Sequence, residues 1–364
     1  MSGIAPAVIA AVLGAIVGSF LNACIHRMPR GIRLGNPRRS FCPACQKLIP
    51  WHENLPVLSW LVLRGRCSGC GTRISIRYPL VELLTAGLFF ATWTTYGLPL
   101  APVYALFLGL MIAATFIDIE HFIIPDEITW GGAAVGILLS GLVPALMGVA
   151  GRFEAMGRSV FGAALGFGIL WLVVEGGKLA FGRKSHKFQA GESFEWKRDG
   201  DRADLRIGEE SLRWEDIFGR ESDVMILRCE SLSVDGQESP GGEVRFRYDR
   251  LIREGNETPL DTLGVISGRL TSVTIPREAM GFGDVKFIAA IGAFLGWQAV
   301  IFTVFAASVI GCVAGLAGIF LARDRSGARI PFGPFLALGA TGWLFGGQRL
   351  FEWYFSLFNR QPPF

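Results

Sequence analysis

The sequence predicts an α-helical membrane protein that crosses the bilayer about eight times, and three observations support this fold class. Hydrophobic residues make up 51% of the 364 positions. Charged residues make up only 18%, whereas an average soluble domain has about 25%. The charges also gather in blocks between long apolar runs. The first of these runs, Ile4–Ala23, has the length of roughly 20 residues that spans a bilayer core.

The apolar runs and the basic residues between them predict a topology. The expected membrane helices are Ile4–Ala23, Pro79–Tyr96, Ala101–Ile117, Glu127–Met147, Gly157–Phe181, Val285–Trp297, Gln298–Leu321 and Phe332–Phe345. Lys and Arg gather in the loops 27–77, 183–275 and 323–329, and the positive-inside rule places such loops in the cytoplasm. The chain then begins outside with an uncleaved first helix. The basic residues indicate topology and do not indicate binding of nucleic acid.

These features divide the chain into five predicted parts. They are a first helix (1–24), a cytoplasmic Cys-rich domain (25–78), helices two to five (79–182), a polar insert (183–275) and the last three helices (276–364). The insert has β-prone runs at Val224–Arg228, Glu243–Tyr248 and Val265–Val273, with turn signals at Asp235-Gly236 and Pro240-Gly241-Gly242. We expect either a small β-rich domain with a modest core or a partly ordered insert.

Four of the seven cysteines form two Cys-x-x-Cys pairs in the first basic loop. They are Cys42, Cys45, Cys67 and Cys70, and 21 residues separate the pairs. Four thiolates at this spacing can surround one Zn²⁺ tetrahedrally, and such a site has a structural role because no coordination position stays open. The alternative is two redox pairs or disulfides, which a cytoplasmic location disfavours. The sequence therefore predicts one structural zinc ion.

Two aspartates lie at ends of predicted membrane helices that run in opposite directions. Asp118 follows the third helix, and Asp284 opens the sixth within Gly281-Phe282-Gly283-Asp284. Both should lie at the cytoplasmic surface, where they could face each other and share one proton. One carboxylate would then activate water while the protonated carboxyl donates to a peptide carbonyl oxygen, near neutral pH. The simpler interpretation of Asp284 is a helix N-cap, and we assign that structural role to Asp126.

Three further polar residues have both a structural and a functional interpretation. Asn22 ends the first helix beside Gly18 and Ser19, where it could serve helix contact or form an active-site hydrogen bond. Glu82 lies inside the second helix, either as an acid that reaches toward water or as a functional group. His121 follows Asp118 closely and could be a ligand or a base, but no partner motif accompanies it, so an interfacial position is expected.

Four motifs of the chain occur together in one known family. They are Gly18-Ser19-Phe20-Leu21-Asn22 followed by Arg27; the double Cys-x-x-Cys loop with Trp51, Asn54, Pro56 and Ser59-Trp60; Tyr78-Pro79-Leu80-Val81-Glu82; and Asp118 with Pro125-Asp126, followed by Ala279-Met280-Gly281-Phe282-Gly283-Asp284-Val285-Lys286. This set resembles the bacterial type IV prepilin leader peptidase and N-methyltransferase family, which processes type IV pilins and the pseudopilins of type II secretion. The resemblance covers most of the chain except the polar insert.

The resemblance implies a multi-pass aspartic endopeptidase of the bacterial inner membrane, with Asp118 and Asp284 as its catalytic acids. Its substrates would be prepilins or pseudopilins with a short basic leader, a Gly at the cleavage point and an apolar helix in the bilayer. Many members also methylate the new N-terminus with S-adenosylmethionine, an activity associated with the Cys-containing loop. All four Cys are present, so the resemblance favours the bifunctional form, although no residue can be assigned to the methyl donor.

Two other functions remain compatible with the residues alone. A transporter also places acidic side chains in the membrane, usually near the midplane and not at its edge. A zinc-bearing membrane scaffold without catalysis would need both aspartates only for structure. Replacing Asp118 or Asp284 with Asn distinguishes these functions from peptide hydrolysis.

Overall fold

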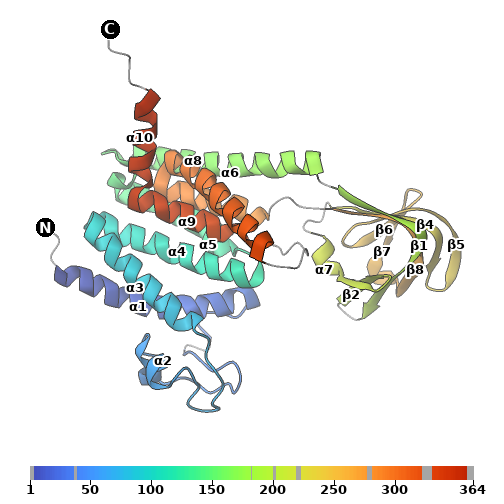
Figure 1. Cartoon of the computed structure of the whole chain (residues 1–364), viewed down its shortest axis with the longest axis horizontal. Coiled ribbons are helices and arrows are strands. Elements are labelled where there is room, and N and C mark those ends of the chain that lie inside the picture. Colours follow the sequence, from blue (N-terminus) through green and yellow to red (C-terminus); the bar gives the residue numbers. More distant parts are fainter. Residues whose placement is uncertain are drawn as a thin grey trace, which may run out of the picture. The chain divides into compact units, whose positions relative to one another are not determined.

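A computed structural model of the chain describes residues 4–36, 39–181, 183–199, 202–218, 223–276, 281–321 and 330–358. The chain forms two compact units. The first comprises residues 1–170 and 282–364 and is helical, and the second comprises residues 171–281 and is mainly a β-sheet. Each unit is drawn in Figure 1.

The helical unit is built from long apolar helices joined by short connections. The helices are α1 (Ile4–Arg27), α2 (Leu58–Val62), α3 (Arg77–Tyr96), α4 (Leu100–His121), α5 (Asp126–Leu142), α6 (Arg152–Phe181), α8 (Phe282–Leu321), α9 (Gly333–Gly342) and α10 (Gln348–Phe358). The last part of α6, from residue 171, falls in the second unit. Among the described residues, four helices are long and apolar enough to cross a membrane: Ile4–Arg30, Leu100–His121, Arg152–Gly177 and Phe282–Gly318. They support a helical membrane protein, and eight crossings are more than these four helices account for.

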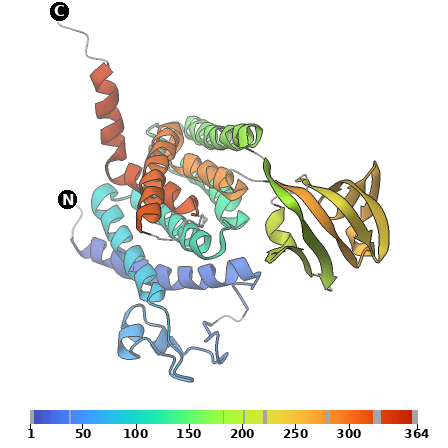
Figure 2. The same ribbon diagram turned by 45° about the vertical axis from the view of Figure 1, so that its right-hand side comes forward.

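Helix α4 is the central helix of this unit. In an apolar 18-residue stretch of α4, 67% of the stretch is buried, compared with 28% in the corresponding stretches of α1 and α6. Helices α1, α3 and α9 contact it, while α5 packs on α8. The residues between α1 and α3 leave the bundle as a separate small lobe, which Figure 2 shows below α1.

Glycines allow the closest helix contacts. A Cβ added at Gly18 in α1 would lie 2.7 Å from the Cα of Glu82 in α3, and one at Gly14 would lie 2.8 Å from the Thr85 carbonyl oxygen. These distances leave no room for a side chain, so α1 and α3 touch through their backbones. The helix contact predicted for the segment around Gly18 is therefore confirmed.

The structure refines several predicted helix ends. Helix α8 is broken at Gly296, where φ is 79° and ψ is 178°, within one residue of the predicted boundary between the sixth and seventh segments. Figure 2 shows the two arms as separate rods. Helix α5 ends at Leu142 and not at Met147, because Pro144 cannot continue it and a short 3₁₀ turn follows. The predicted eighth helix is interrupted at Trp343–Gly347, between α9 and α10.

The second unit contains one antiparallel sheet. Its strands are β1 (Arg183–Asp199), β2 (Arg202–Ile207), β3 (Glu210–Arg213), β4 (Met225–Val234), β5 (Gln237–Phe246), β6 (Arg250–Arg253), β7 (Asn256–Pro259) and β8 (Val265–Pro276). The strand order is β3-β2-β1-β8-β4-β5-β6-β7, so that the first and last strands pair at its centre. The prediction of a β-rich insert is confirmed.

The sheet encloses a substantial aromatic core. Trp196, Met225 and Phe246 are buried, and the short helix α7 (Trp214–Ile217) adds Trp214 to them. The predicted turn at residues 240–242 is wrong, since these residues lie inside β5 and pair with β4. A Cβ at Gly241 would collide with the backbone carbonyls of β4, so glycine permits close strand approach there and makes no turn.

Candidate active site and metal centre

Asp118 is held at the end of α4 by the local backbone. The helix stops because Phe122 adopts a left-handed conformation, and its N–H bonds to the Asp118 carbonyl at 2.9 Å. The Asp118 side chain is buried, and its Oδ2 accepts a hydrogen bond of 3.1 Å from the N–H of Gly333 at the start of α9. A Cβ on Gly333 would lie 2.6 Å from this oxygen, so the contact requires glycine.

Asp284 lies in the first turn of α8 and is 8% exposed. The helix begins at Phe282, so Asp284 is inside the helix and is not its N-cap. Its Oδ1 is buried and has no hydrogen-bond partner among the described residues. Leaving a buried polar atom unpaired destabilises a fold, and such an atom is therefore a candidate for binding water or substrate.

The structure brings the two aspartates together. Asp118 and Asp284 lie at the same end of the helical unit, although 166 positions separate them in the chain. Ile124, which is buried, lies beside both Gly283 and Gly333, so the end of α4 meets the starts of α8 and α9. Two acids in such a place can share a proton and act as acid and base on one substrate.

Charged residues surround this pair at the same end of the helices. Lys286 Nζ donates to Asp126 Oδ1 at 2.7 Å, which ties the start of α8 to the start of α5. The helix-cap role expected for Asp126 is therefore wrong, since its side chain pairs with this cation and α5 has no side-chain cap. Arg77 pairs with Glu120, and His121 lies at the partly exposed edge, 3.9 Å from the same glutamate.

The four predicted zinc ligands converge in the lobe between α1 and α3. All four Sγ atoms lie within 4.8 Å of one another. The Cys42–Cys70 and Cys45–Cys67 sulfurs are 3.8 and 4.0 Å apart, too far for disulfides, whose S–S bond is about 2.05 Å. Sulfurs placed tetrahedrally around one Zn²⁺ at about 2.3 Å would be about 3.8 Å apart, so the residues fit this metal.

The two Cys pairs have the same local structure, 25 positions apart. Cys42 N–H bonds to the Lys47 carbonyl, and Cys67 N–H bonds to the Thr72 carbonyl. The bridges Phe41↔Leu48 and Arg66↔Arg73 flank the pairs. Gln46 and Gly71, which occupy matching positions, both have positive φ. Each pair is therefore a tight turn that presents its sulfurs to one point.

Hydrogen bonds in the second turn favour thiolates. Contacts with the side chain and backbone of Thr72 lower the pKa of Cys70 to about 6. The backbone N–H groups of Cys70 and Gly69 lower the pKa of Cys67. Because the metal-binding form of cysteine is the thiolate, these contacts favour that form in the second turn. In the first turn, the backbone of Lys47 lowers the pKa of Cys45, but desolvation and hydrogen bonds with the other three thiols outweigh it and raise this pKa to about 11.

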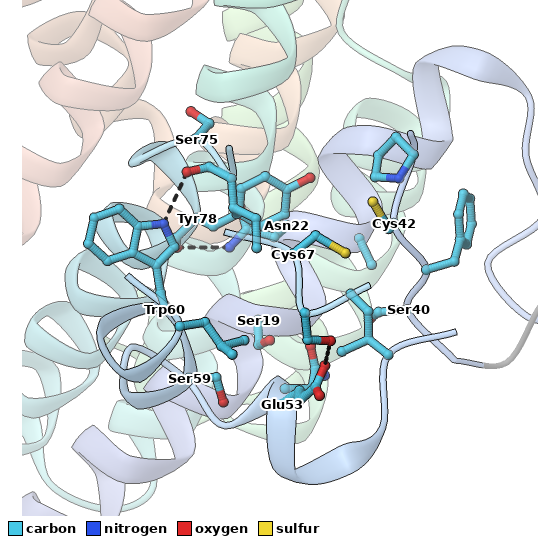
Figure 3. A pocket seen from close by; sticks show the side chains of 18 of the residues that line it. Ser19, Asn22, Ser40, Cys42, Glu53, Ser59, Trp60, Cys67, Ser75 and Tyr78 are labelled. Atoms are coloured by element: carbon cyan, nitrogen blue, oxygen red, sulfur yellow. Dashed lines mark hydrogen bonds between the residues drawn. The ribbon is translucent and has the colours of Figure 1, made fainter. Parts of the chain in front are cut away.

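A cavity of about 380 Å³ lies between α1, α3 and the Cys lobe, and Figure 3 shows the side chains around it. Asn22 from α1 donates to the Tyr78 carbonyl at 3.0 Å, and its Oδ1 has no partner among the described residues. Glu82 from α3 accepts the Val57 N–H at 2.7 Å. Trp60 forms another part of the wall, and its indole N–H donates to the Ile74 carbonyl.

The sequence indicates Asn22 and Glu82 as candidates, but it does not reveal two residues whose backbone N–H groups hold acidic side chains. Gly333 holds Asp118, and Val57 holds Glu82. Gly333 could have been noticed because it stands between Phe332 and Pro334 at the start of an apolar run. Val57 gives no signal in the sequence. Its φ is 61°, and because a β-branched residue rarely adopts such a value, nothing in its residue type predicts this conformation. Both act through the backbone N–H, which every residue except proline has.

Two family models match separate parts of this chain, and most of the sheet unit lies outside both matches. The family model described as the bacterial peptidase A24 N-terminal domain matches residues 12–96, and that of the type IV leader peptidase family matches residues 105–184 and 259–316. Together they match more than half of the chain. The stretch between the last two ranges lies in the sheet unit.

Several curated relatives carry one description, prepilin leader peptidase/N-methyltransferase. The protein of Aeromonas hydrophila is 29% identical over 373 residues, which cover 94% of this chain and 91% of the relative. The protein of Stutzerimonas stutzeri is 26% identical, with 92% and 88% covered. The protein of Myxococcus xanthus is 46% identical over 176 residues, 44% of this chain and 52% of the relative. No solved structure matches the chain.

Proposed function

Because this chain belongs to the type IV leader peptidase family, we propose that it removes the short basic leader of type IV prepilins or pseudopilins and then methylates the new N-terminus. Cleavage follows a Gly at the cytoplasmic face of the bacterial inner membrane. The substrate's apolar helix lies in the bilayer, which leaves the bond to be cut at the surface where the two aspartates lie. The observation that carries this proposal is that the end of α4, with Asp118, lies beside the start of α8, with Asp284.

In the proposed reaction, the two carboxyl groups share one proton and divide the acid and base roles. The ionised carboxylate takes a proton from water, the water oxygen attacks the carbonyl carbon, and the protonated carboxyl donates its proton to the carbonyl oxygen. When the intermediate breaks down, the C–N bond cleaves and the amine leaves with a proton from the acid that first acted as base. The other carboxylate takes a proton from a hydroxyl of the intermediate, so that a carboxylic acid forms and the pair again holds one proton. The Gly333 N–H holds one oxygen of Asp118, while Oδ1 of Asp284 has no described partner.

Single substitutions test this assignment. Asp118→Asn and Asp284→Asn should each lower the rate of leader removal by about 10²–10⁴-fold, the usual contribution of a general acid or base. Co-expression with a prepilin, followed by mass spectrometry of its N-terminus, measures the cut. Asp261→Asn is the matched control, since Asp261 is exposed in the sheet unit. Leader removal at the normal rate by either variant would refute the catalytic pair.

The proposed topology has eight crossings, with the N-terminus outside and the Cys lobe and sheet unit in the cytoplasm. The four helices identified by length and composition leave α3, α5 and α9 to complete this count, together with a division of α8 at Gly296. Reaction of single cysteines with a membrane-impermeant maleimide in intact cells and in inverted vesicles tests the assignment. A cysteine at Ser68 in a variant without the other thiols should react only in inverted vesicles.

We propose that Cys42, Cys45, Cys67 and Cys70 hold one Zn²⁺ with a structural role. Four sulfurs fill a tetrahedral shell, so the ion supplies a cross-link within the lobe and leaves no position for substrate. The convergence of the four sulfurs and the distances between them support this proposal. The cross-link would fix the wall of the neighbouring cavity, which contains residues from the same lobe.

A further inference from the structure

We propose that the cavity between α1, α3 and the Cys lobe binds the methyl donor S-adenosylmethionine, and that Glu82 and Asn22 recognise its positively charged groups. This inference rests on the proposed N-methyltransferase function and assigns its donor site to residues. The cavity lies wholly within the helical unit. Its volume of about 380 Å³ falls in the range of about 300–1,000 Å³ that is usual for small-molecule sites.

Asn22 supplies the first argument. Its side chain is 2% exposed, and its amide nitrogen donates to the Tyr78 carbonyl, which fixes the orientation of the group. Asn22 lines the cavity, and its buried Oδ1 lacks a hydrogen-bond partner among the described residues. Because an unpaired buried acceptor is costly, Oδ1 is suited to accept a hydrogen bond from a ligand.

Glu82 and Val57 supply the second argument. Glu82 is 7% exposed and lines the same cavity. Within the described parts of the chain, no Lys, Arg or His forms an ion pair with it. Its carboxylate is instead held by the Val57 N–H at 2.7 Å. A buried carboxylate without a cation is unfavourable, and a cationic ligand would neutralise it.

The backbone at Val57 is strained in order to make this contact. Its φ of 61° and ψ of −48° are rare for a β-branched residue. Such conformations are energetically unfavourable and gather at functional sites. The strain aims the N–H at Glu82 and fixes the carboxylate before a ligand arrives.

The remaining wall suits a donor of this chemistry. The ligand carries a sulfonium, an ammonium, a carboxylate and an aromatic base, so its site needs both signs of charge and an aromatic surface. Trp60 and Tyr78 line the cavity, and aromatic faces attract cations and stack on bases. Lys47 and Arg73 are cationic lining residues that could meet the ligand's carboxylate.

The cavity is also linked to the aspartate pair through the helical unit. Arg77, beside Tyr78 at the start of α3, forms an ion pair with Glu120, two positions after Asp118. Both sites therefore lie at the same end of α3 and α4. An N-terminus produced at the aspartates would have a short path to the donor.

The transfer itself balances without a further reactant. The lone pair of the neutral N-terminal amine forms a bond to the methyl carbon, and the electron pair of the broken carbon–sulfur bond stays on sulfur. The methylated amine then gives one proton to water. The other product, S-adenosylhomocysteine, has a neutral sulfur, so a carboxylate that recognises the sulfonium would favour the donor over this product.

Binding of two ligands to the full chain in lipid nanodiscs tests the site, with isothermal titration calorimetry as the readout. Wild-type protein should bind S-adenosylmethionine more tightly than S-adenosylhomocysteine. Glu82→Gln should weaken S-adenosylmethionine binding by about tenfold or more, the effect of losing a desolvated charge pair, and should remove this preference. Asn22→Leu should weaken both ligands. Glu127→Gln is the matched control, because Glu127 is exposed at the start of α5.

The possible results of this experiment distinguish an error in the placement of the methyl donor from an error in the proposed methyltransferase function. Zinc content and thermal unfolding of each variant report whether it is folded. Wild-type protein that removes leaders but binds neither ligand would overturn the methyltransferase function. Wild-type binding whose strength and preference survive Glu82→Gln and Asn22→Leu would overturn only the placement of the donor. Equal weakening of both ligands by folded Glu82→Gln would overturn the role of its charge.

Discussion

The N–H of Gly333 donates a 3.1 Å hydrogen bond to the carboxylate of Asp118, across 215 positions of the sequence. This contact joins the start of α9 to the end of α4 in the buried region that also contains Asp284. Glycine is required because a Cβ would lie 2.6 Å from the accepting oxygen. Gly333 is thus a positioning residue for the proposed catalytic pair.

Gly333→Ala should therefore displace Asp118 and lower the rate of leader removal by about 10²-fold, the cost of misplacing a catalytic group by about 1 Å. Rates of prepilin cleavage by purified protein measure the effect. Gly168→Ala in α6 is the control, since a Cβ there meets nothing within 4 Å. Normal cleavage by Gly333→Ala would show that the contact does not position the acid.

The pH dependence of cleavage should have two limbs, because one carboxyl of the pair must be ionised and the other protonated. Below the optimum the base becomes protonated, and above it the acid loses its proton, so the rate falls on both sides. We expect the optimum near neutral pH. Initial rates with a fixed prepilin between pH 4 and 10 measure the profile, and a rate that stays flat from acid to neutral pH would contradict a shared proton.

The sequence predicted those features that depend on composition and on motifs. Long apolar runs indicated the long helices, and paired cysteines at a known spacing indicated a cluster that the structure brings together. Asp118 was selected because an acid at the end of an apolar helix is costly. In each case the local sequence carries the physical cause.

Other features depended on contacts between distant segments, which no local pattern encodes. The N–H groups of Gly333 and Val57 hold acids that are 215 and 25 positions away. The partner of Asp126 is Lys286, 160 positions away, so an expectation based on helix capping failed. The glycines at 241 and 242 signalled a turn, although they serve close strand pairing.

Metal content is the direct check on the Cys lobe. Purified protein should contain one zinc per chain, and Cys42→Ser should lose most of it, because three thiolates leave the tetrahedral shell incomplete. Inductively coupled plasma mass spectrometry gives the ratio of metal to protein. Cys312→Ser removes an exposed thiol outside the cluster and should keep the metal. Wild-type protein with no metal and four free thiols would refute the zinc site.

Cys229 should be chemically protected by the sheet. Burial raises the pKa of its thiol to about 11, whereas an unfolded cysteine titrates near 8.5. The folded thiol therefore stays neutral between these values while the unfolded one ionises. Stability of the sheet unit is unaffected below about pH 8 and falls as the pH rises toward 11. At pH 8, iodoacetamide should modify Cys229 in urea but not in native protein, as measured by peptide mass spectrometry.

The sheet unit should be removable without loss of leader cleavage. Its first and last strands pair along their length, and Arg183 is the register partner of Pro276, so the two ends of the insert lie side by side. A short Gly/Ser linker can therefore replace residues 183–276 without stretching the chain. The sheet has its own buried core, and both proposed catalytic acids lie in the other unit.

Cleavage within about threefold of the wild-type rate is expected after this excision, because no group of the acid pair is removed. A matched variant that shortens only the β4–β5 turn at Asp235 and Gly236 controls for damage to expression. If the excised protein keeps its zinc but no longer cuts prepilins, the sheet must contribute to substrate binding or to the arrangement of the acids.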